Sequence, residues 1–402
     1  MNRQDILERL RAQIAVNGHV VGAVVGSGMA AKFVAMAGID FLLALSAGRF
    51  RIAGRSSYAS YFCYGNSNQI VKEYGTSELL PIIRDVPVLF GLFASDPFIA
   101  LGPFLDEIRE SGFSGVVNFP TVALLDGQFR EAAEEDGVTF QCEADAIAMA
   151  HERDLFTVAF VTNGSQAREM AEAGADVICA HLGLTRGGYV GDGQSIPITR
   201  AEQIAREVFT ACQQVRPEVI RMVYSGPAST PVDMQYLYDN TPCQGYIGGS
   251  VFDRIPSEKA ILDAAIAFKS GGNATKEARM RRLVRRSMRP SDYADVVKQH
   301  VAENYAHPIH LRDIALVLHL SYSHLSALFT REVGCTFTEY LIRYRMNIAQ
   351  DLLRQSTASI GEIARSVGYR DPGQFSKTFK KRVGLPPGAF RLAEGRDWMG
   401  RS

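Results

Sequence analysis

One apolar pattern occurs twice in the sequence, as IALVLHLSYSHLSALFTREVG at residues 314–334 and as IARSVGYRDPGQFSKTFKKRVG at residues 363–384. In each copy the apolar residues fall at helical spacing on both sides of a short break, at 319–321 and at 368–370. This spacing predicts a short helix, a tight turn and a second helix that packs back on the first. The repeat therefore predicts two helix-turn-helix motifs, each with one helix that can read DNA.

The stretch between the two copies, 336–355, has helical periodicity and contains neither Gly nor Pro. A helix of about 20 residues spans roughly 30 Å, which is close to the ~34 Å turn of B-DNA. A stiff connector of that length can set two reading helices into successive major grooves. An all-helical dimerisation module would show the same apolar stripes, but it would not need the repeat.

The second copy and the residues after it carry a resemblance. GYRD at 368–371, FSKTFKK at 375–381 and GLPPGAFR at 384–391 resemble the signature of the AraC/XylS family of bacterial transcriptional regulators, and the resemblance extends over 292–392. In that family the second helix of each motif enters the major groove of a double-stranded DNA operator. The resemblance places ten residues on the reading helices or at their phosphate-facing end: Ser323, His324, Ser326, Ala327, Gly373, Gln374, Ser376, Lys377, Lys380 and Lys381.

The predicted reading helices carry few long polar side chains. Ser323 and Ala327 are small where relatives often carry Arg or Gln, and Pro372-Gly373 opens the second helix. Small side chains make few bidentate base contacts. We therefore expect the operator to be read partly through DNA shape and backbone contacts.

Charge is divided unevenly along the 402 residues. Residues 269–402 carry 23 Lys and Arg against 12 Asp and Glu, a net of +11, and residues 1–268 hold the remaining 20 and 31, a net of −11. An acidic part joined to a basic one suits a sensor attached to a polyanion binder. The sequence predicts a barrel domain at 1–270, a basic linker at 271–290 and a DNA-binding domain at 291–393.

Cysteine usage and the first residues favour a cytoplasmic protein. The six cysteines are scattered without a Cys-x-x-Cys pair and indicate reduced thiols. The first 16 residues predict a charged amphipathic helix rather than a signal peptide, and no apolar run reaches membrane-spanning length.

Residues 18–270 alternate short apolar runs with amphipathic helical stretches eight times. The runs that we expect to form strands are Val20–Val25, Phe41–Leu45, Val86–Leu92, Gly115–Asn118, Thr157–Val161, Asp176–Ala180, Val219–Tyr224 and Gly245–Ile247. Continuous apolar runs are typical of strands buried on both faces of a parallel sheet. Eight β/α units in about 250 residues favour an α/β fold of the TIM-barrel type, with a doubly wound open sheet as the competitor.

The working face of a TIM barrel is formed by the segments that follow the strands. Gly and Ser clusters follow the first, seventh and eighth runs, where backbone N–H groups can approach an anion closely. Arg49, Arg51 and Arg55 follow the second run, and we expect Arg49 to close over the ligand because Ala47-Gly48 precedes it. The predicted ligand-binding residues are Gly26, Ser27, Gly28, Arg49, Asn118, His181, Ser225, Gly226, Gly248, Gly249 and Ser250.

The barrel half of the chain carries a second resemblance. SAGRFRIAG at 46–54, NFPT at 118–121, HLGLT at 181–185 and GGSVFDRIPSE at 248–258 resemble the TIM-barrel family labelled phosphoenolpyruvate hydrolase-like. The family is related in fold to the phosphoenolpyruvate mutase and isocitrate lyase barrels, so the resemblance implies a small anionic ligand more than a reaction. Relatives tend to carry His-Gly-Gly-Pro after the seventh strand, whereas this chain has Tyr-Ser-Gly-Pro at 224–227, which weakens an acid/base role there.

Catalytic residues are not evident in the barrel sequence. Phosphoenolpyruvate mutase-type chemistry needs Mg²⁺ held by carboxylates at strand ends, but only Asp96 lies just beyond an expected strand, with Asp253 further along the last loop. His181 could serve as a general base, although a lone His at a strand end is more often a core residue. We expect no resident metal or cofactor, and Mg²⁺ only if the barrel is catalytic.

These features together predict a transcriptional regulator of AraC type whose barrel senses a small anionic metabolite. RNA polymerase and a second copy of the chain, in a dimer, are the further partners expected. The alternative is a bifunctional enzyme that acts on a small phosphorylated or carboxylated metabolite and regulates its own gene.

Overall fold

The computed structural model describes the chain except residues 63, 186, 189–195, 270–289 and 399–402. The chain divides into two compact units, Met1–Thr275 and Lys276–Ser402. The first holds an α/β barrel and the second is helical, which confirms the predicted fold class. The linker predicted at 271–290 lies outside the described residues up to 289. No helix among those described is long and apolar enough to cross a membrane.

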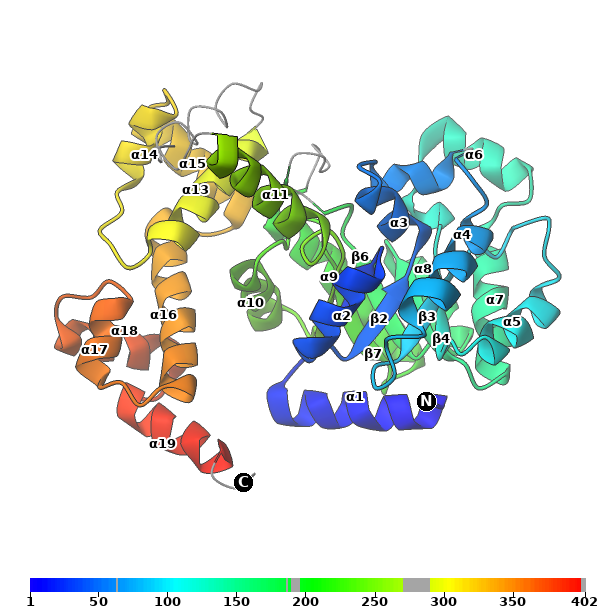
Figure 1. The fold of residues 1–402 in the computed structure, drawn as a ribbon, viewed down its shortest axis with the longest axis horizontal. Helices are drawn as coiled ribbons and strands as arrows, with labels where there is room; N and C mark the ends of the chain where they lie inside the picture. Colours follow the sequence, from blue (N-terminus) through cyan, green and yellow to red (C-terminus); the bar gives the residue numbers. More distant parts are fainter. Residues whose placement is uncertain (63, 186, 189–195, 270–289, 399–402) are drawn as a thin grey trace. The chain divides into compact units, whose positions relative to one another are not determined.

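The first unit is a closed barrel of parallel strands that follow one another in sequence order (Figure 1). The strands are β1 (Val20–Val25), β2 (Phe41–Ala44), β3 (Val88–Leu92), β4 (Gly115–Asn118), β5 (Phe156–Val161), β6 (Val177–His181), β7 (Ile220–Tyr224) and β8 (Gly245–Gly248). Each predicted strand is present, with ends that differ by two residues or fewer. The barrel closes through β1 and β8, which pair Val20 with Gly245 and Ala23 with Gly248.

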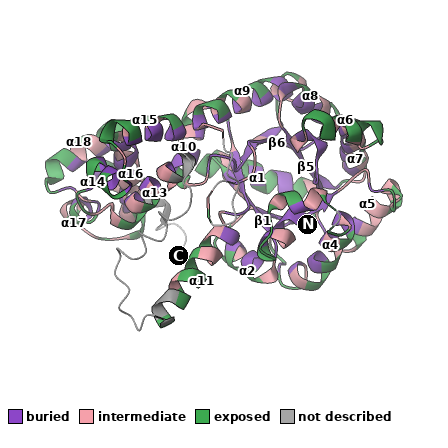
Figure 2. Ribbon diagram, turned by 90° about the horizontal axis from the view of Figure 1, so that it is seen from above, coloured by how far each residue is buried: buried purple, intermediate pink, exposed green. Residues whose placement is uncertain are grey.

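Helices surround the barrel, so its strands are buried on both faces; Figure 2 shows them within a ring of half-exposed helices. The helical segments after β1 are α2 (Gly28–Met36), α3 (Ser46–Ile52), η1 (Ser57–Tyr61), α4 (Ser67–Tyr74), η2 (Gly75–Leu79), α5 (Leu101–Glu110), η3 (Val122–Leu124), α6 (Gly127–Glu135), α7 (Phe140–Glu152), α8 (Gly164–Glu172), α9 (Ile198–Val215), α10 (Pro231–Asn240) and α11 (Arg254–Lys269). Because α3 follows β2 at once, Arg49 and Arg51 lie on a helix rather than in a loop.

Helix α1 (Arg3–Asn17) closes the amino-terminal end of the barrel (Figure 1). Its buried Ile6, Leu7 and Leu10 belong to the same apolar cluster as the side chains inside the barrel. Arg3 adds two hydrogen bonds to the buried carboxylate of Asp176, at 2.8 and 2.7 Å. The strand-to-helix segments lie at the opposite, carboxyl end of the strands.

The second unit confirms the predicted repeat of two helix-turn-helix motifs. Its helices are α13 (Pro290–Asn304), α14 (Leu311–Val317), α15 (Tyr322–Val333), α16 (Phe337–Gln355), α17 (Ile360–Ser366), α18 (Pro372–Val383) and α19 (Pro387–Trp398). The turn before each second helix contains a left-handed residue, His319 at φ 55° and Gly368 at φ 84°. Both second helices, α15 and α18, end at a left-handed glycine, Gly334 and Gly384.

Helix α16 joins the two motifs, and its 19 residues span about 28 Å. Its Arg345 donates to the backbone carbonyls of Tyr305 and His307, ahead of the first motif, at 2.9 Å each. The same guanidinium lies 5.6 Å from the ring centroid of Tyr369, in the second motif. A Cβ on Gly368 would lie 2.7 Å from Arg345, so the second turn has room for glycine alone. Arg345 therefore holds both motifs to one connector.

Phe379 anchors the second reading helix, so its removal tests the core of the helical unit. The ring is fully buried and packs against Phe375 and Phe390. Phe379→Ala should lower the free energy of unfolding of this unit by about 3–5 kcal/mol, a large part of what a domain of ~100 residues has. Scanning calorimetry of the full chain measures the change, and Leu385→Ala, at a side chain that is 45% exposed, is the control. An unchanged melting transition for Phe379→Ala would contradict this packing.

Candidate functional site

The carboxyl ends of the strands enclose a buried arginine, Arg51 of α3, which is 3% exposed. One terminal nitrogen donates to the carbonyl of Val24 at 3.3 Å and lies 3.5 Å from Oδ2 of Asp253, while the other lies 3.5 Å from the Ser57 hydroxyl. Its Nε is buried and finds no hydrogen-bond partner among the residues described. A buried guanidinium with an unused N–H can donate to one more hydrogen-bond acceptor.

Tyr224, at the end of β7, and Gly249, after β8, complete the surroundings of Arg51. A Cβ on Gly249 would lie 2.7 Å from the Tyr224 hydroxyl and 3.1 Å from Arg51, so only glycine allows this approach. Burial raises the pKa of Tyr224, which keeps its hydroxyl a donor at neutral pH. Burial opposes the charge of Arg51, but Asp253, Tyr224 and Tyr74 together outweigh it, and the pKa of Arg51 is raised.

Arg49, the arginine predicted to bind the ligand, lies on another face of α3 and pairs with the carboxylate of Glu78. Its guanidinium is 2.9 Å from Glu78 and donates to the carbonyl of Gly26 at 3.3 Å. Glu78 also accepts from the N–H of Gly28 at 3.4 Å, and the Ser27 hydroxyl caps α2. The structure therefore brings these predicted residues together around Glu78, and their contact with a ligand stays a prediction.

The backbone is closely packed where the segments after β7 and β8 approach each other. Ser225 is fully buried at φ 30°, a left-handed value that favours glycine. A Cβ on Gly226 would collide with the Leu182 carbonyl. The Ser225 N–H already donates to Ile247, at 3.2 Å. The predicted residues that lie in these two segments are Ser225, Gly226, Gly248, Gly249 and Ser250.

His181 ends β6 and is held as a neutral core side chain. Its ring stacks on Tyr224, with 4.5 Å between centroids, and meets Phe160 edge-on at 5.3 Å. Burial lowers the pKa of His181 to about 3, and its Nδ1 accepts from the N–H of Gly183 at 3.3 Å. At neutral pH this imidazole carries no charge with which to attract an anion.

Asn118, at the end of β4, forms a buried polar network with Glu143 of α7. Its amide exchanges two hydrogen bonds with the backbone of Phe160, at 2.6 and 3.0 Å. It also donates to Glu143 at 2.6 Å, and the N–H of Val122 donates to the other carboxylate oxygen at 2.7 Å. Burial raises the pKa of Glu143 to about 7. Asn118 thus joins β4 to β5 and α7, and its ligand contact stays a prediction.

The two carboxylates expected near the strand ends already have donors in place. Asp96 accepts from the amides of Asn66 and Asn68, at 2.7 and 2.9 Å, and Asp253 faces Arg51 and the backbone of α11. In the part of the chain that the structure describes, no three His, Cys, Asp or Glu side chains are grouped so as to hold a metal ion.

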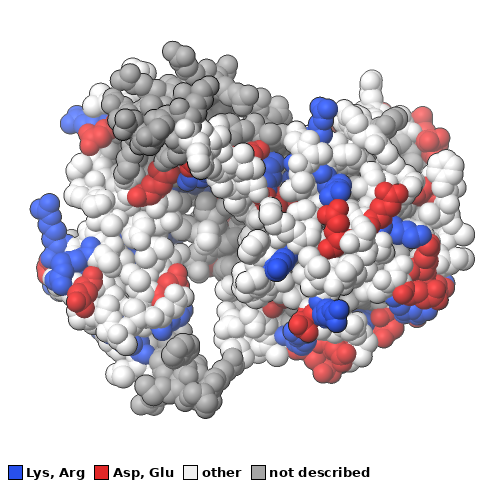
Figure 3. All heavy atoms as spheres, viewed as in Figure 1, with Lys and Arg blue, Asp and Glu red and all other residues white. Residues whose placement is uncertain are grey.

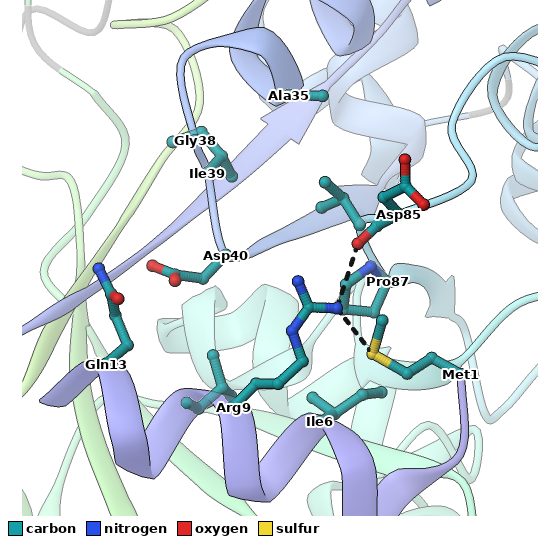
Figure 4. Close-up of a pocket in the computed structure, with 12 residues that line it drawn as sticks. Met1, Ile6, Arg9, Gln13, Ala35, Gly38, Ile39, Asp40, Asp85 and Pro87 are labelled. Atoms are coloured by element: carbon teal, nitrogen blue, oxygen red, sulfur yellow. Dashed lines mark hydrogen bonds between the residues drawn. The ribbon is translucent and has the colours of Figure 1, made fainter. Parts of the chain in front are cut away.

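A pocket of about 350 Å³ lies at the other end of the barrel, between α1 and the segments that precede β2 and β3 (Figure 4). Arg9 of α1 reaches into it and donates to the backbone carbonyl of Asp85 at 3.3 Å. Asp40 faces the same space and accepts from the N–H of Val21 at 2.7 Å. The pocket therefore contains neither Arg51 nor any predicted ligand residue.

The two reading helices bury one face and expose the other. The buried faces rest on Leu325 and Phe329 in α15 and on Phe375 and Phe379 in α18. The predicted DNA-contacting residues that are exposed are Ser323, His324, Ala327, Gly373, Gln374, Lys377, Lys380 and Lys381, and those that are half-buried are Ser326 and Ser376.

Charge distinguishes the two reading helices. Helix α18 carries four basic residues and no acidic one, with three of them in its last turn. In α15, Arg331 is the basic residue and pairs with the adjacent Glu332 at 3.1 Å. On the barrel face shown in Figure 3, acidic and basic side chains are interspersed. Helix α18 therefore carries more positive charge than α15.

The family model described as phosphoenolpyruvate hydrolase-like matches residues 5–270, about two thirds of the chain. The chain belongs to this family. A helix-turn-helix domain model matches residues 314–393, the region of the repeat. The two resemblances read from the sequence are thereby confirmed.

Named relatives share the barrel family and extend beyond it. ToMV resistance protein Tm-1(GCR237) of Solanum lycopersicum is 37% identical over 269 residues, which are 67% of this chain and 36% of that protein. Putative transcriptional regulatory protein y4pA of Sinorhizobium fredii is 37% identical over 275 residues, 68% of this chain and 45% of that protein. The chain thus spans less than half the length of these relatives.

A solved structure resembles the helical unit. The C-terminal domain of AraT, a response regulator from Geobacillus stearothermophilus, is 31% identical, with a TM-score of 0.26. The match covers 26% of this chain and 88% of that one.

Helical spacing is the signal that distinguishes Arg51 from Arg49. Ala47 and Gly48 of α3 are buried, and Arg51 lies four and three positions further along, on the same face. Arg49 is offset from that face. No local sequence pattern indicates the roles of Glu78 and Glu143, because the hydrogen-bond partners of each are far away in the sequence.

Glu143 makes the stability of the barrel depend on pH. Its pKa rises from the ordinary value of 4.5 to about 7 in the folded state, so the folded chain holds this proton more tightly than the unfolded chain. Stability should therefore fall as pH rises through this window, by at most about 1.4 kcal/mol per pH unit.

Glu143→Gln should remove this pH dependence because the amide stays neutral at every pH. Denaturant unfolding of the full chain at about pH 5 and about pH 8 measures the change. Glu131→Gln, at an exposed carboxylate of α6, is the control that should keep the wild-type dependence. Equal pH dependence in wild type and Glu143→Gln would contradict the prediction.

Proposed function

We propose that the protein is a DNA-binding transcriptional regulator of AraC type. The observation that carries the proposal is the pair of helix-turn-helix motifs, each with an exposed second helix, on a 19-residue connector. A connector of about 28 Å is close in length to one turn of B-DNA, which supports reading of two successive major grooves. The relative y4pA, named a putative transcriptional regulatory protein, supports the same function. Double-stranded operator DNA is the partner, in the cytoplasm, with RNA polymerase and a dimeric form as part of the proposal.

The two motifs contribute unequally in this proposal. Ser323 and Ala327 of α15 offer short side chains, so the first motif acts through shape and backbone contacts. On α18, Gln374 and Lys377 reach base edges, and Lys380 and Lys381 reach phosphates. The second motif therefore supplies most of the charge-dependent affinity.

The barrel senses a small anionic metabolite in this proposal. The support is the set of polar groups at the carboxyl ends of the strands: the buried cation of Arg51, the Tyr224 hydroxyl and the close backbone at Gly249. Ligands of TIM barrels bind at this end. A barrel that binds a metabolite and a helical unit that binds DNA together make a ligand-controlled regulator.

Lys380 and Lys377 should have different effects on DNA binding. Lys380→Ala should weaken binding to all sequences alike and lower the salt slope of the affinity by about one unit, because a phosphate contact is lost. Lys377→Ala should instead change the sequence preference of the second half-site. Fluorescence anisotropy over a salt series, on operators selected from random DNA by the wild type, measures both effects.

Lys32→Ala is the matched control, because this exposed lysine lies on α2 of the barrel. It should bind DNA as the wild type does. An unchanged salt slope for Lys380→Ala would remove Lys380 from the contact set, and failure of the wild type to select any sequence would overturn the proposed function.

A further inference from the structure

Arg51 and Asp253 form a buried ion pair of poor geometry. Their side chains are 2% and 1% exposed, yet the nearest nitrogen and oxygen are 3.5 Å apart. A good charge-assisted hydrogen bond is about 2.8 Å long. Burial removes water from both charges, and a pair of this length with one unused N–H offsets less of that cost than a short, fully bonded pair would. An acceptor that receives hydrogen bonds from two N–H groups of Arg51 would therefore interact with this arginine more favourably than Asp253 does.

The groups around Arg51 are suited to such an acceptor. The Tyr224 hydroxyl and the Gly249 backbone face the guanidinium from β7 and β8. Ser57 of η1 covers it on another side, 3.5 Å away. Nε and a terminal nitrogen of a guanidinium form a planar fork that matches the two oxygens of a carboxylate. The chemistry thus favours the carboxylate of a small acid.

Asp253 connects Arg51 to the start of α11. The same carboxylate accepts from the backbone N–H of Arg254, the first residue of the helix. The backbone carbonyl of Asp253 accepts from the Ser257 hydroxyl at 2.6 Å. Arg254, also buried, donates to Ser250 at 3.3 Å and to Glu258 at 2.9 Å. A movement of the Asp253 side chain would therefore alter the hydrogen bonds of the first turn of α11.

We propose that Arg51 binds the carboxylate of the barrel's ligand, that Asp253 holds this position until the ligand arrives, and that its release shifts the first turn of α11. The inference rests on the proposed function and names the ligand class and the coupling at that same site. Helix α11 is the last element of the barrel unit before the chain continues to the helical unit. The segment that carries Ser57 must move for the exchange to occur.

Binding of oxalate, a small planar dicarboxylate, to the full chain tests the site. We expect calorimetry to show binding to wild type, a loss of about tenfold or more in Arg51→Met and no change in Arg55→Met, whose arginine is exposed on the same segment. Asp253→Asn should bind oxalate more tightly than wild type, because the internal competitor has lost its charge. Asp253→Asn keeps the size of the side chain, so it tests the site even where Arg51→Met does not fold.

Three results would overturn the site: no binding of oxalate to wild type, unchanged binding in Arg51→Met, or equal or weaker binding in Asp253→Asn. Tighter binding of inorganic phosphate than of oxalate would overturn the carboxylate assignment.

Operator affinity tests the coupling separately. Oxalate should change the affinity of wild type for its selected operator, and Asp253→Asn without oxalate should already show the changed affinity. An operator affinity that ignores both oxalate and Asp253→Asn would overturn the coupling. A chain that binds oxalate at Arg51 but selects no DNA would overturn the proposed function and leave the site in place, so the two failures are distinguishable.

Discussion

The pairing of β1 with β8 is the constraint on which the rest of the barrel depends. An open sheet would leave two unpaired edges, and closure removes both. The register of Val20 with Gly245 also brings the carboxyl ends of the first and last strands together. Arg51 and Asp253 meet for this reason, although they are 202 residues apart in the sequence. The buried cation, its tyrosine and the close glycine backbone are consequences of closure rather than of any local motif.

Much of the fold follows from local sequence patterns, and much of the site does not. The strands were predictable because burial on both faces demands continuous apolar runs, and the two motifs because helical spacing repeats. The sequence draws attention to Arg49 because Ala47-Gly48 precedes it, but the helical spacing of α3 also turns Arg51 inward. The pairings of Arg49 with Glu78 and of Asn118 with Glu143 depend on tertiary packing, which leaves no periodic trace in the sequence.

Arg345 illustrates the same limit in the helical unit. The sequence predicts a connector of the right length, but length alone does not fix how two motifs sit on it. Arg345 does so by donating to the carbonyls of Tyr305 and His307, which are backbone groups that any residue supplies. The close approach at Gly368 then explains why the second turn uses a left-handed glycine, whereas the first uses His319. In the proposed function, two reading helices that are held to one connector in this way would let the second motif position the first on DNA.

A loose buried ion pair is a poor stabiliser but a suitable element for a switch. Removing water from Arg51 and Asp253 costs several kcal/mol per ion, and a contact of 3.5 Å offsets less of this cost than a short hydrogen-bonded pair would. In the proposed switch, a ligand shifts the balance between the arrangement with Asp253 in place and the one in which Asp253 has left only by its differential affinity for the two. A tighter pair would hold α11 in place against any ligand, and an absent carboxylate would leave the ligand nothing to displace. In this proposal, the long distance between the two charges is what lets a small acid displace Asp253 and act on α11.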